Sequence, residues 1–133
     1  MVFRCYSETD EKICLKFFPC KNTGENMTWE EWHDKKPLTI YFTDYRKLLL
    51  EYISEIYPIK DITNNEIIQS FDKCFDNWIG KNDWNKIIEK IKTKINENNK
   101  RILKIENEFY KNFIEWIENE LEWADIIVAE GNL

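Results

Sequence analysis

The chain has few of the residues on which common catalytic and cofactor sites depend. It contains one histidine, His33, and only three glycines and three prolines among its 133 residues. The glycines, Gly24, Gly80 and Gly131, stand far apart, so there is neither a phosphate-binding glycine loop nor a dinucleotide fingerprint. No stretch approaches the roughly 18 apolar residues of a membrane-spanning helix. The lack of a glycine motif excludes nucleotide binding through a glycine-rich loop. The lack of a long apolar stretch excludes insertion as a transmembrane helix.

The four cysteines lack the spacing of a zinc site. Eight residues separate Cys5 from Cys14, five separate Cys14 from Cys20, and twelve separate Cys20 from His33, whereas zinc sites use closely spaced pairs. Convergence of these three thiols in the fold stays open at this stage. The start MVFRCYSETDEK has no apolar segment followed by small residues, as a secretory signal would have. We therefore expect a cytoplasmic protein with reduced cysteines, no bound metal and no cofactor.

What the chain does have is an apolar and aromatic composition that suits a folded domain. Hydrophobic residues make up 43% and aromatic residues 15%, including six tryptophans. A chain of this length can bury about two thirds of its unfolded surface and needs no second core. We therefore expect a single globular domain over residues 1–133.

The N-terminal part of the chain predicts a small antiparallel sheet. Residues 2–6 and 13–18 alternate in character around the turn SETDEK, which predicts a hairpin with Cys5 opposite Cys14. The turn lacks the glycine of a two-residue hairpin, so a longer loop with a shifted register is the alternative. Residues 38–42 predict a further strand, and the C-terminal DIIVAEGNL could add a last strand beside the hairpin.

Helical periodicity dominates the middle of the chain. Residues 44–57 repeat apolar side chains every three or four positions, and Pro58 ends the pattern. A capping box of Thr63 and Glu66 opens a second predicted helix, which stops near Gly80. The apolar face of this second helix would consist of Ile67, Ile68, Phe71, Phe75 and Ile79.

One apolar phase continues from Trp84 to Phe109 and beyond, through the poor helix-forming segment NENNKR. Because the phase survives this segment, we favour one long helix over residues 83–122. A break at Asn98 and Asn99 that divides the segment into two helices is the alternative. The predicted fold class is therefore α+β, with a small antiparallel sheet packed on three or four helices, the last one long.

The net charge of −6 hides an asymmetry along the chain. Residues 81–111 carry nine bases and five acids, whereas residues 112–133 carry six acids and no base. The basic segment could contact nucleic acid, but such lysines more often form the solvated face of a helix, and the acidic chain repels phosphate. We therefore do not expect a nucleic-acid partner.

Two acidic surfaces are the candidate partner-binding sites. The first is a stripe of Glu115, Glu118, Glu122 and Asp125 on one face of the predicted last helix, near its C-terminus, where the helix dipole disfavours anions. The second is a short predicted helix capped by Thr28. Its candidate residues are Trp29, Glu30, Glu31, Trp32 and Asp34. Tryptophan is enriched at interface hot spots, and charged rims speed association with an oppositely charged partner. In the alternative interpretation, the acids of the first surface only keep the protein soluble, and the two tryptophans of the second surface pack in the core.

Together these patterns favour recognition over catalysis. We expect a small acidic protein that inhibits a basic protein partner: an immunity protein that neutralises a bacterial nuclease toxin, or alternatively a phage anti-defence inhibitor of the anti-CRISPR kind. A small enzyme that uses His33 with carboxylates or a thiol is a second class. A self-associating helical adaptor is the third, and its contact face would be Trp84, Ile88, Ile91, Ile95 and Ile102. The sequence leaves the identity of the partner and the oligomeric state open.

Overall fold

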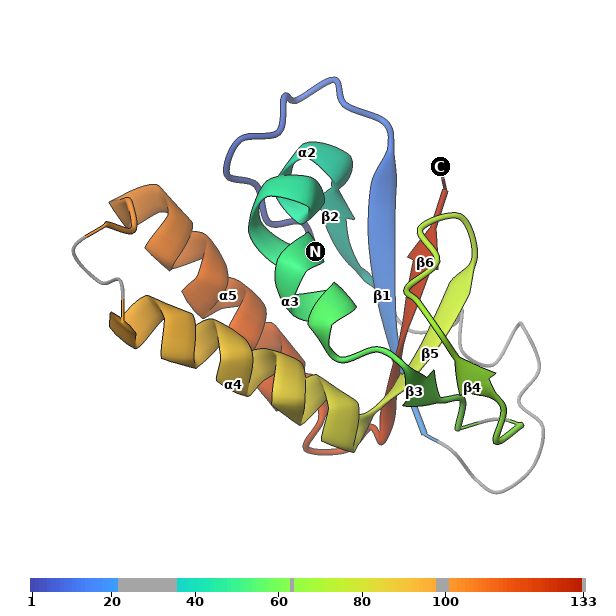
Figure 1. Cartoon of the computed structure of the whole chain (residues 1–133). Helices are drawn as coiled ribbons and strands as arrows, with labels where there is room; N and C mark the ends of the chain where they lie inside the picture. Colours follow the sequence, from blue (N-terminus) through green and yellow to red (C-terminus); the bar gives the residue numbers. More distant parts are fainter. Residues whose placement is uncertain (22–35, 63, 98–100, 133) are drawn as a thin grey trace.

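The computed structural model describes residues 1–21, 36–62, 64–97 and 101–132. It confirms an α+β fold, with a four-stranded antiparallel sheet, a small two-stranded sheet and helices on one face of the larger sheet (Figure 1). Within these ranges, no helix is long and apolar enough to span a membrane.

The larger sheet has the strand order β2-β1-β6-β5, and each neighbouring pair is antiparallel. β1 spans Cys14–Cys20, β2 spans Leu38–Tyr41, β5 spans Asp76–Gly80 and β6 spans Ile126–Gly131. The predicted C-terminal strand is therefore confirmed, and it lies inside the sheet between β1 and β5. The first four side chains of β6 are fully buried.

The predicted N-terminal hairpin is not formed. β1 pairs with β2 and β6 instead, and Cys14 lies opposite Tyr41 rather than Cys5. The N-terminal residues run beside β2, with one parallel bridge between Val2 and Thr39. Because β1 lies inside the sheet, its backbone N–H and C=O groups need partners on both edges, and the distant β6 supplies the longer pairing.

The first predicted helix is present in three consecutive pieces. α2 spans Phe42–Asp44, a π-helical segment spans Tyr45–Leu49, and α3 spans Leu50–Glu55. The apolar repeat places Leu48, Leu49, Tyr52, Ile53 and Ile56 on one face; the first four of these side chains are buried and Ile56 is partly buried.

The second predicted helix, over residues 63–80, is wrong. β3 (Ile59–Lys60) and β4 (Ile67–Ile68) form a small antiparallel hairpin, and the end of the segment is β5 in the main sheet. Ile79 is fully buried as predicted, but Phe75 is 69% exposed. The β-branched and aromatic residues of this segment suit short strands as well as a helix, and pairing of β5 with β6 decides between them.

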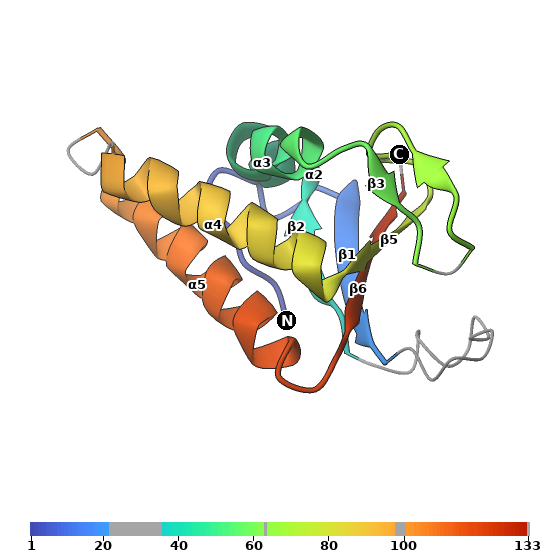
Figure 2. The ribbon, with the colours of Figure 1, turned by 60° about the horizontal axis from the view of Figure 1, so that its bottom comes forward.

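The single helix favoured over residues 83–122 is also wrong, and the two-helix alternative is correct. α4 spans Lys81–Glu97 and α5 spans Lys104–Glu120, and the two helices pack side by side as a hairpin (Figure 2). Leu103 has an extended backbone at the start of α5, and its N–H donates to the Glu106 carboxylate at 3.4 Å. The apolar phase survives the break because both helices pack their apolar faces on one core. As predicted, the last helix is long.

The main core lies between the sheet and the helices. Trp84, Phe17 and Phe113 are fully buried at its centre, with ring centroids 5.8 to 6.3 Å apart. The Trp84 indole N–H donates to the Ile127 carbonyl at 3.0 Å, which connects the start of α4 to the inner strand β6. A smaller buried cluster on the other face of the sheet contains Phe18, Cys20, Ile126 and Val128.

Candidate functional site

The predicted acidic stripe is divided by the end of α5. Glu115 and Glu118 lie on the helix, which ends at Glu120, so Glu122 lies in the following turn and Asp125 just before β6. The three glutamates of the stripe are exposed and Asp125 is partly buried. The helical geometry that placed all four carboxylates on one face therefore holds only for the first two.

Glu115 and Glu118 border a groove between α4 and α5, with a volume of about 440 Å³. The residues that line this groove are Lys92, Ile95, Asn107, Lys111, Ile114, Glu115, Glu118 and Asn119. Asp125 lies in a different depression, at the start of α4, together with Lys60 and Lys81. The structure thus brings two carboxylates of the stripe together with two lysines and separates them from Asp125.

The second predicted surface falls outside the described residues. It comprises Thr28, Trp29, Glu30, Glu31, Trp32, His33 and Asp34. Its role in partner binding, and any catalytic role of His33, stay predictions.

Lysines on α4 pair with carboxylates on both sides of the helix. Lys90 lies 3.3 Å from Glu55 of α3, and Lys92 lies 3.2 Å from Glu118 of α5. The paired side chains are 42 to 50% exposed, and pairs of this kind contribute at most about 1 kcal/mol to stability. These ion pairs have a larger effect on the electrostatic potential of the surface. The carboxylates beside the lysines reduce the positive potential that nucleic-acid binding requires.

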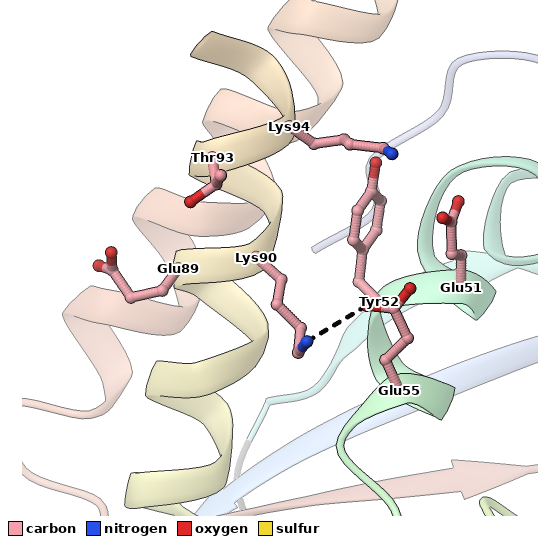
Figure 3. Close-up of a pocket in the computed structure, with 7 residues that line it drawn as sticks. All are labelled: Glu51, Tyr52, Glu55, Glu89, Lys90, Thr93 and Lys94. Carbon is pink, nitrogen blue, oxygen red and sulfur yellow. Dashed lines mark ion pairs between the residues drawn. The ribbon is translucent and has the colours of Figure 1, made fainter. Parts of the chain in front are cut away.

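Figure 3 shows the pocket between α3 and α4, which has a volume of about 290 Å³. The Tyr52 side chain stands between Glu51 and Lys94, and the Lys90–Glu55 ion pair lies at one end. The pocket is completed by Glu89 and Thr93. With both signs of charge around one phenol, this pocket suits hydrogen bonding to a polar group better than burial of an apolar ligand.

The phenols near this pocket are weak acids. Burial raises the pKa of Tyr52 and of Tyr110, whose hydroxyl donates to the Leu48 carbonyl at 2.9 Å. The Tyr6 hydroxyl donates to the Glu106 carboxylate at 2.6 Å, and this hydrogen bond raises the pKa of Tyr6 to about 12. All three phenols therefore stay protonated at neutral pH, and those of Tyr6 and Tyr110 act as hydrogen-bond donors.

The three thiols whose convergence the sequence left open, those of Cys5, Cys14 and Cys20, do not form one group. Cys14 and Cys20 stand at opposite ends of β1, about 20 Å apart for six residues of strand. In the described part of the chain, no three His, Cys, Asp or Glu side chains are grouped to hold a metal ion. Burial raises the pKa of the Cys14 thiol, and that of Cys20 to about 12. These thiols are protonated at neutral pH, which makes them weak nucleophiles.

Sequence reasoning missed the role of Asp44, which it treated as a helix start. The Asp44 carboxylate is fully buried and accepts hydrogen bonds from the N–H groups of Cys5 (2.9 Å) and Tyr6 (2.6 Å) and from the Ser7 hydroxyl (2.8 Å). Nothing in the local pattern distinguishes this aspartate from an exposed cap, since its donors come from a remote segment.

Sequence reasoning also missed a surface depression with a mixed apolar and polar lining, which we call the β4 pocket. It has a volume of about 650 Å³ and lies between the helical run after β2, strand β4 and the loop that follows. Its lining residues are Tyr45, Leu50, Ile67, Ile68, Gln69, Ser70, Phe71, Asp72, Lys73 and Cys74. The apolar residues of this segment are evident in the sequence, but their spacing predicts the buried face of a helix.

No protein-family model, curated protein or solved structure matches this chain. The charges, pockets and exposed side chains described above are therefore the basis for a functional proposal.

Proposed function

We propose that this protein is a small acidic inhibitor of a basic protein partner, and specifically an immunity protein that neutralises a bacterial nuclease toxin. The observation that supports this proposal is the charge of the C-terminal segment. Residues 112–133 contain six acids and no base, and Glu115, Glu118 and Glu122 are exposed on α5 and the turn after it. A nuclease binds phosphates with basic residues, and an inhibitor's carboxylates would occupy or cover the same positions.

An exposed tryptophan lies among these acids. Trp123 is 40% exposed, and its indole N–H donates to the Glu120 carboxylate at 2.8 Å. The hydrogen bond orients the ring at the surface, and tryptophan is among the residues most enriched at interface hot spots. The combination of tryptophan and carboxylates that the sequence places at residues 29–34 therefore also occurs after α5.

The carboxylates at this end of α5 oppose the helix dipole. The last turn of the helix, which is described in full, contains no basic residue. Anions at a helix C-terminus cost about 0.3 to 1 kcal/mol each at low salt. The pair of Glu118 with Lys92 offsets part of this cost, whereas Glu122 is exposed in the turn. Carboxylates that lower the stability of a helix end are expected where they bind the positive charges of a partner.

The adaptor alternative is less well supported, because its contact face is used inside the fold. Trp84, Ile88 and Ile91 are at most 3% exposed and belong to the main core. The anti-CRISPR-like alternative differs from an immunity protein only in the partner, so the same acidic surface would serve it.

The proposal is tested with purified nucleases: toxins encoded beside the gene for this protein, and phage-defence nucleases as the comparison. We expect stoichiometric inhibition of one toxin. The complex should weaken as salt rises from about 0.1 M to 1 M, because the Debye length falls from about 10 Å to about 3 Å. Inhibition of a phage-defence nuclease instead would select the anti-defence alternative. If neither group is inhibited, the proposal is wrong.

A charge-neutral variant then tests the surface. Replacing Glu115, Glu118 and Glu122 with Gln should weaken binding roughly tenfold, mainly by slowing association, since rim charges act on the on-rate. The matched control neutralises three other exposed carboxylates on the helical hairpin, those of Glu89, Glu97 and Glu108. Binding kinetics at two salt concentrations compare the variants. Equal effects of both would move the binding face toward the predicted surface at residues 29–34.

A further inference from the structure

The β4 pocket combines apolar side chains with one buried phenol. Leu50 and Ile67 line it and are 37% and 56% exposed, whereas Tyr45, which also lines it, is only 1% exposed. The ring of Phe71, another lining residue, lies 5.8 Å from that of Tyr45 and 6.2 Å from that of Tyr57, as measured between centroids. Pockets of about 650 Å³ that present apolar side chains and a few polar groups are typical sites for small molecules.

The Tyr45 hydroxyl is a hydrogen-bond donor that the rest of the described chain does not use. It makes no hydrogen bond with another described residue. Among the described residues, no fully enclosed side-chain oxygen or nitrogen lacks a partner, so this hydroxyl must reach open space, and Tyr45 lines the β4 pocket. Burial raises the pKa of Tyr45 to about 12, so the hydroxyl keeps its proton at neutral pH. A buried phenol usually has a hydrogen-bond partner, which leaves this one available to a ligand.

The backbone on both sides of the pocket is held in place. Tyr45 begins the π-helical segment Tyr45–Leu49, and π-helical turns are rare and frequently occur at functional sites. Across the pocket, the Asn77 side chain donates to the carbonyls of Asp72 (2.6 Å) and Ala129 (3.0 Å) and accepts from the Asp72 N–H (2.8 Å). A site that is ordered before binding loses little conformational entropy in a complex, which favours affinity.

The charges of the lining favour an uncharged ligand. Asp72 and Lys73 are both exposed and opposite in sign, so they give the pocket no net charge. The Asp72 carboxylate accepts the Cys74 N–H at 2.9 Å, and the Lys73 ammonium lies 5.9 Å from the centroid of the Phe42 ring. Moving an ion from water to apolar side chains costs far more than moving an uncharged group. Neither a cation nor an anion therefore gains from this pocket what an uncharged molecule gains.

We infer that the β4 pocket binds a small uncharged molecule with an apolar body and one oxygen that accepts a hydrogen bond from the Tyr45 hydroxyl. Ketones, esters and amides with an aromatic or aliphatic body have this chemistry. The site is independent of the proposed function. Figure 1 shows β4 at the end of the molecule opposite the tip of the α4–α5 hairpin, and inhibition of a nuclease by the acids of α5 needs no ligand here.

The experiment titrates the isotope-labelled full chain with four probes that share one phenyl ring and is followed by the NMR shifts of backbone amides. The probes are acetophenone, ethylbenzene, benzylammonium and benzoate. We expect acetophenone to bind roughly twofold to tenfold more tightly than ethylbenzene, the ratio that one neutral hydrogen bond supplies, and more tightly than either ion. The shifts should gather at the amides of Ile67, Phe71 and Cys74. Equal affinity for acetophenone and ethylbenzene, tighter binding of an ion, or no shift at these amides up to the solubility limit would overturn the inference.

Tyr45→Phe connects the preference to the hydroxyl. It should remove the preference for acetophenone and leave the affinity for ethylbenzene unchanged. Because the hydroxyl makes no hydrogen bond with another described residue, the variant should fold normally, which circular dichroism checks. The matched control is Tyr52→Phe, which removes a phenol from the pocket between α3 and α4 and should keep the preference. A Tyr45→Phe variant that still prefers acetophenone would show that the hydroxyl does not bind the probe.

Ile67→Ser tests the apolar wall. It should weaken the binding of acetophenone and ethylbenzene alike by several-fold, since it removes apolar contact area. Ile105→Ser, at a 50% exposed position at the start of α5, is the control and should leave both affinities unchanged.

Sedimentation tests the other occupant, a second copy of the chain. A wild-type dimer that becomes a monomer in the Ile67→Ser variant would assign the pocket to self-association and overturn the inference. A monomer at the concentrations of the titration, with the expected order of probe affinities, would support a small-molecule site. All of these measurements use the protein alone, so their failure would remove the ligand site while inhibition of a nuclease could still be observed.

Discussion

Asp44 joins two parts of the chain that are distant in sequence. Its carboxylate stands in the first helical piece after β2 and binds the backbone N–H groups of Cys5 and Tyr6. A buried carboxylate is costly unless donors satisfy its oxygens, and here three hydrogen bonds do so. The Tyr6 hydroxyl extends this connection to Glu106 on α5. The N-terminal segment is thus held by side-chain hydrogen bonds and not by the strand pairing that its alternation predicted.

Replacing Asp44 with Asn should lower the free energy of unfolding by about 2 kcal/mol, in the range for hydrogen bonds to a charged group. Asparagine keeps one acceptor oxygen but turns an amide donor toward a backbone N–H. Urea unfolding followed by tryptophan fluorescence measures the loss. Glu8→Gln, at an exposed position on the same segment, is the control and should change stability by less than about 0.5 kcal/mol. An Asp44→Asn variant as stable as the wild type would show that these hydrogen bonds do not hold the segment.

Among the elements, β6 makes the most varied connections. It pairs with β1 on one side and β5 on the other, and its Ile127 carbonyl accepts the Trp84 indole N–H from α4. Its last residue, Gly131, lies against the backbone of Lys73 and donates its N–H to the Phe75 carbonyl at 3.2 Å. The C-terminal strand therefore supports both the core and the loop beside the β4 pocket.

Gly131→Ala should destabilise the protein by about 1 to 3 kcal/mol, because the new Cβ would overlap the Lys73 carbonyl and force the strand or the loop to move. Gly80→Ala is the matched control. Its Cβ would lie 3.6 Å from Ile62 Cδ1 and 3.9 Å from the Asp125 carbonyl oxygen, which is ordinary contact. Thermal unfolding of the two variants makes the comparison. Wild-type stability of Gly131→Ala would mean that the loop moves easily, and it would weaken the case for an ordered β4 pocket.

Tyrosines with raised pKa values make the stability of the whole molecule fall at alkaline pH. Burial raises the pKa of Tyr45 to about 12 from an ordinary value near 10, and it also raises the pKa values of Tyr57 and Tyr110. A phenol with a raised pKa in the folded state keeps its proton at a pH where the unfolded chain has lost it. Its contribution to stability is therefore complete below about pH 10 and is lost as pH rises toward 12.

We expect the free energy of unfolding to be clearly lower at pH 11 than at pH 8, because at pH 11 the unfolded state releases protons that the folded state retains. Urea unfolding at the two pH values measures the difference. Tyr45→Phe removes one of these phenols and should make the decrease smaller. An unchanged pH dependence in this variant would show that Tyr45 does not contribute to it.

Features that depend on local patterns could be predicted from the sequence. Alternation and β-branched residues indicated the strands at residues 38–42 and in the C-terminal DIIVAEGNL, and apolar spacing indicated the helical run before Pro58. These patterns repeat with the period of the element itself, so they can be recognised without knowledge of what packs against them. The separation of charge, with only acids after Lys111, is likewise a property of the sequence.

What each apolar or acidic residue contacts depends on the packing of distant segments and could not be predicted from the sequence. The residues of 63–80 fit a helix face, but pairing of β5 with β6 makes the end of that segment a strand and leaves Ile67 at the surface. The apolar phase across residues 83–122 continues through a chain reversal because α4 and α5 share one core. Asp125 leaves the acidic stripe because α5 ends earlier. Periodicity shows which side chains are apolar, whereas contacts between segments far apart in the chain select the strand or helix that covers them.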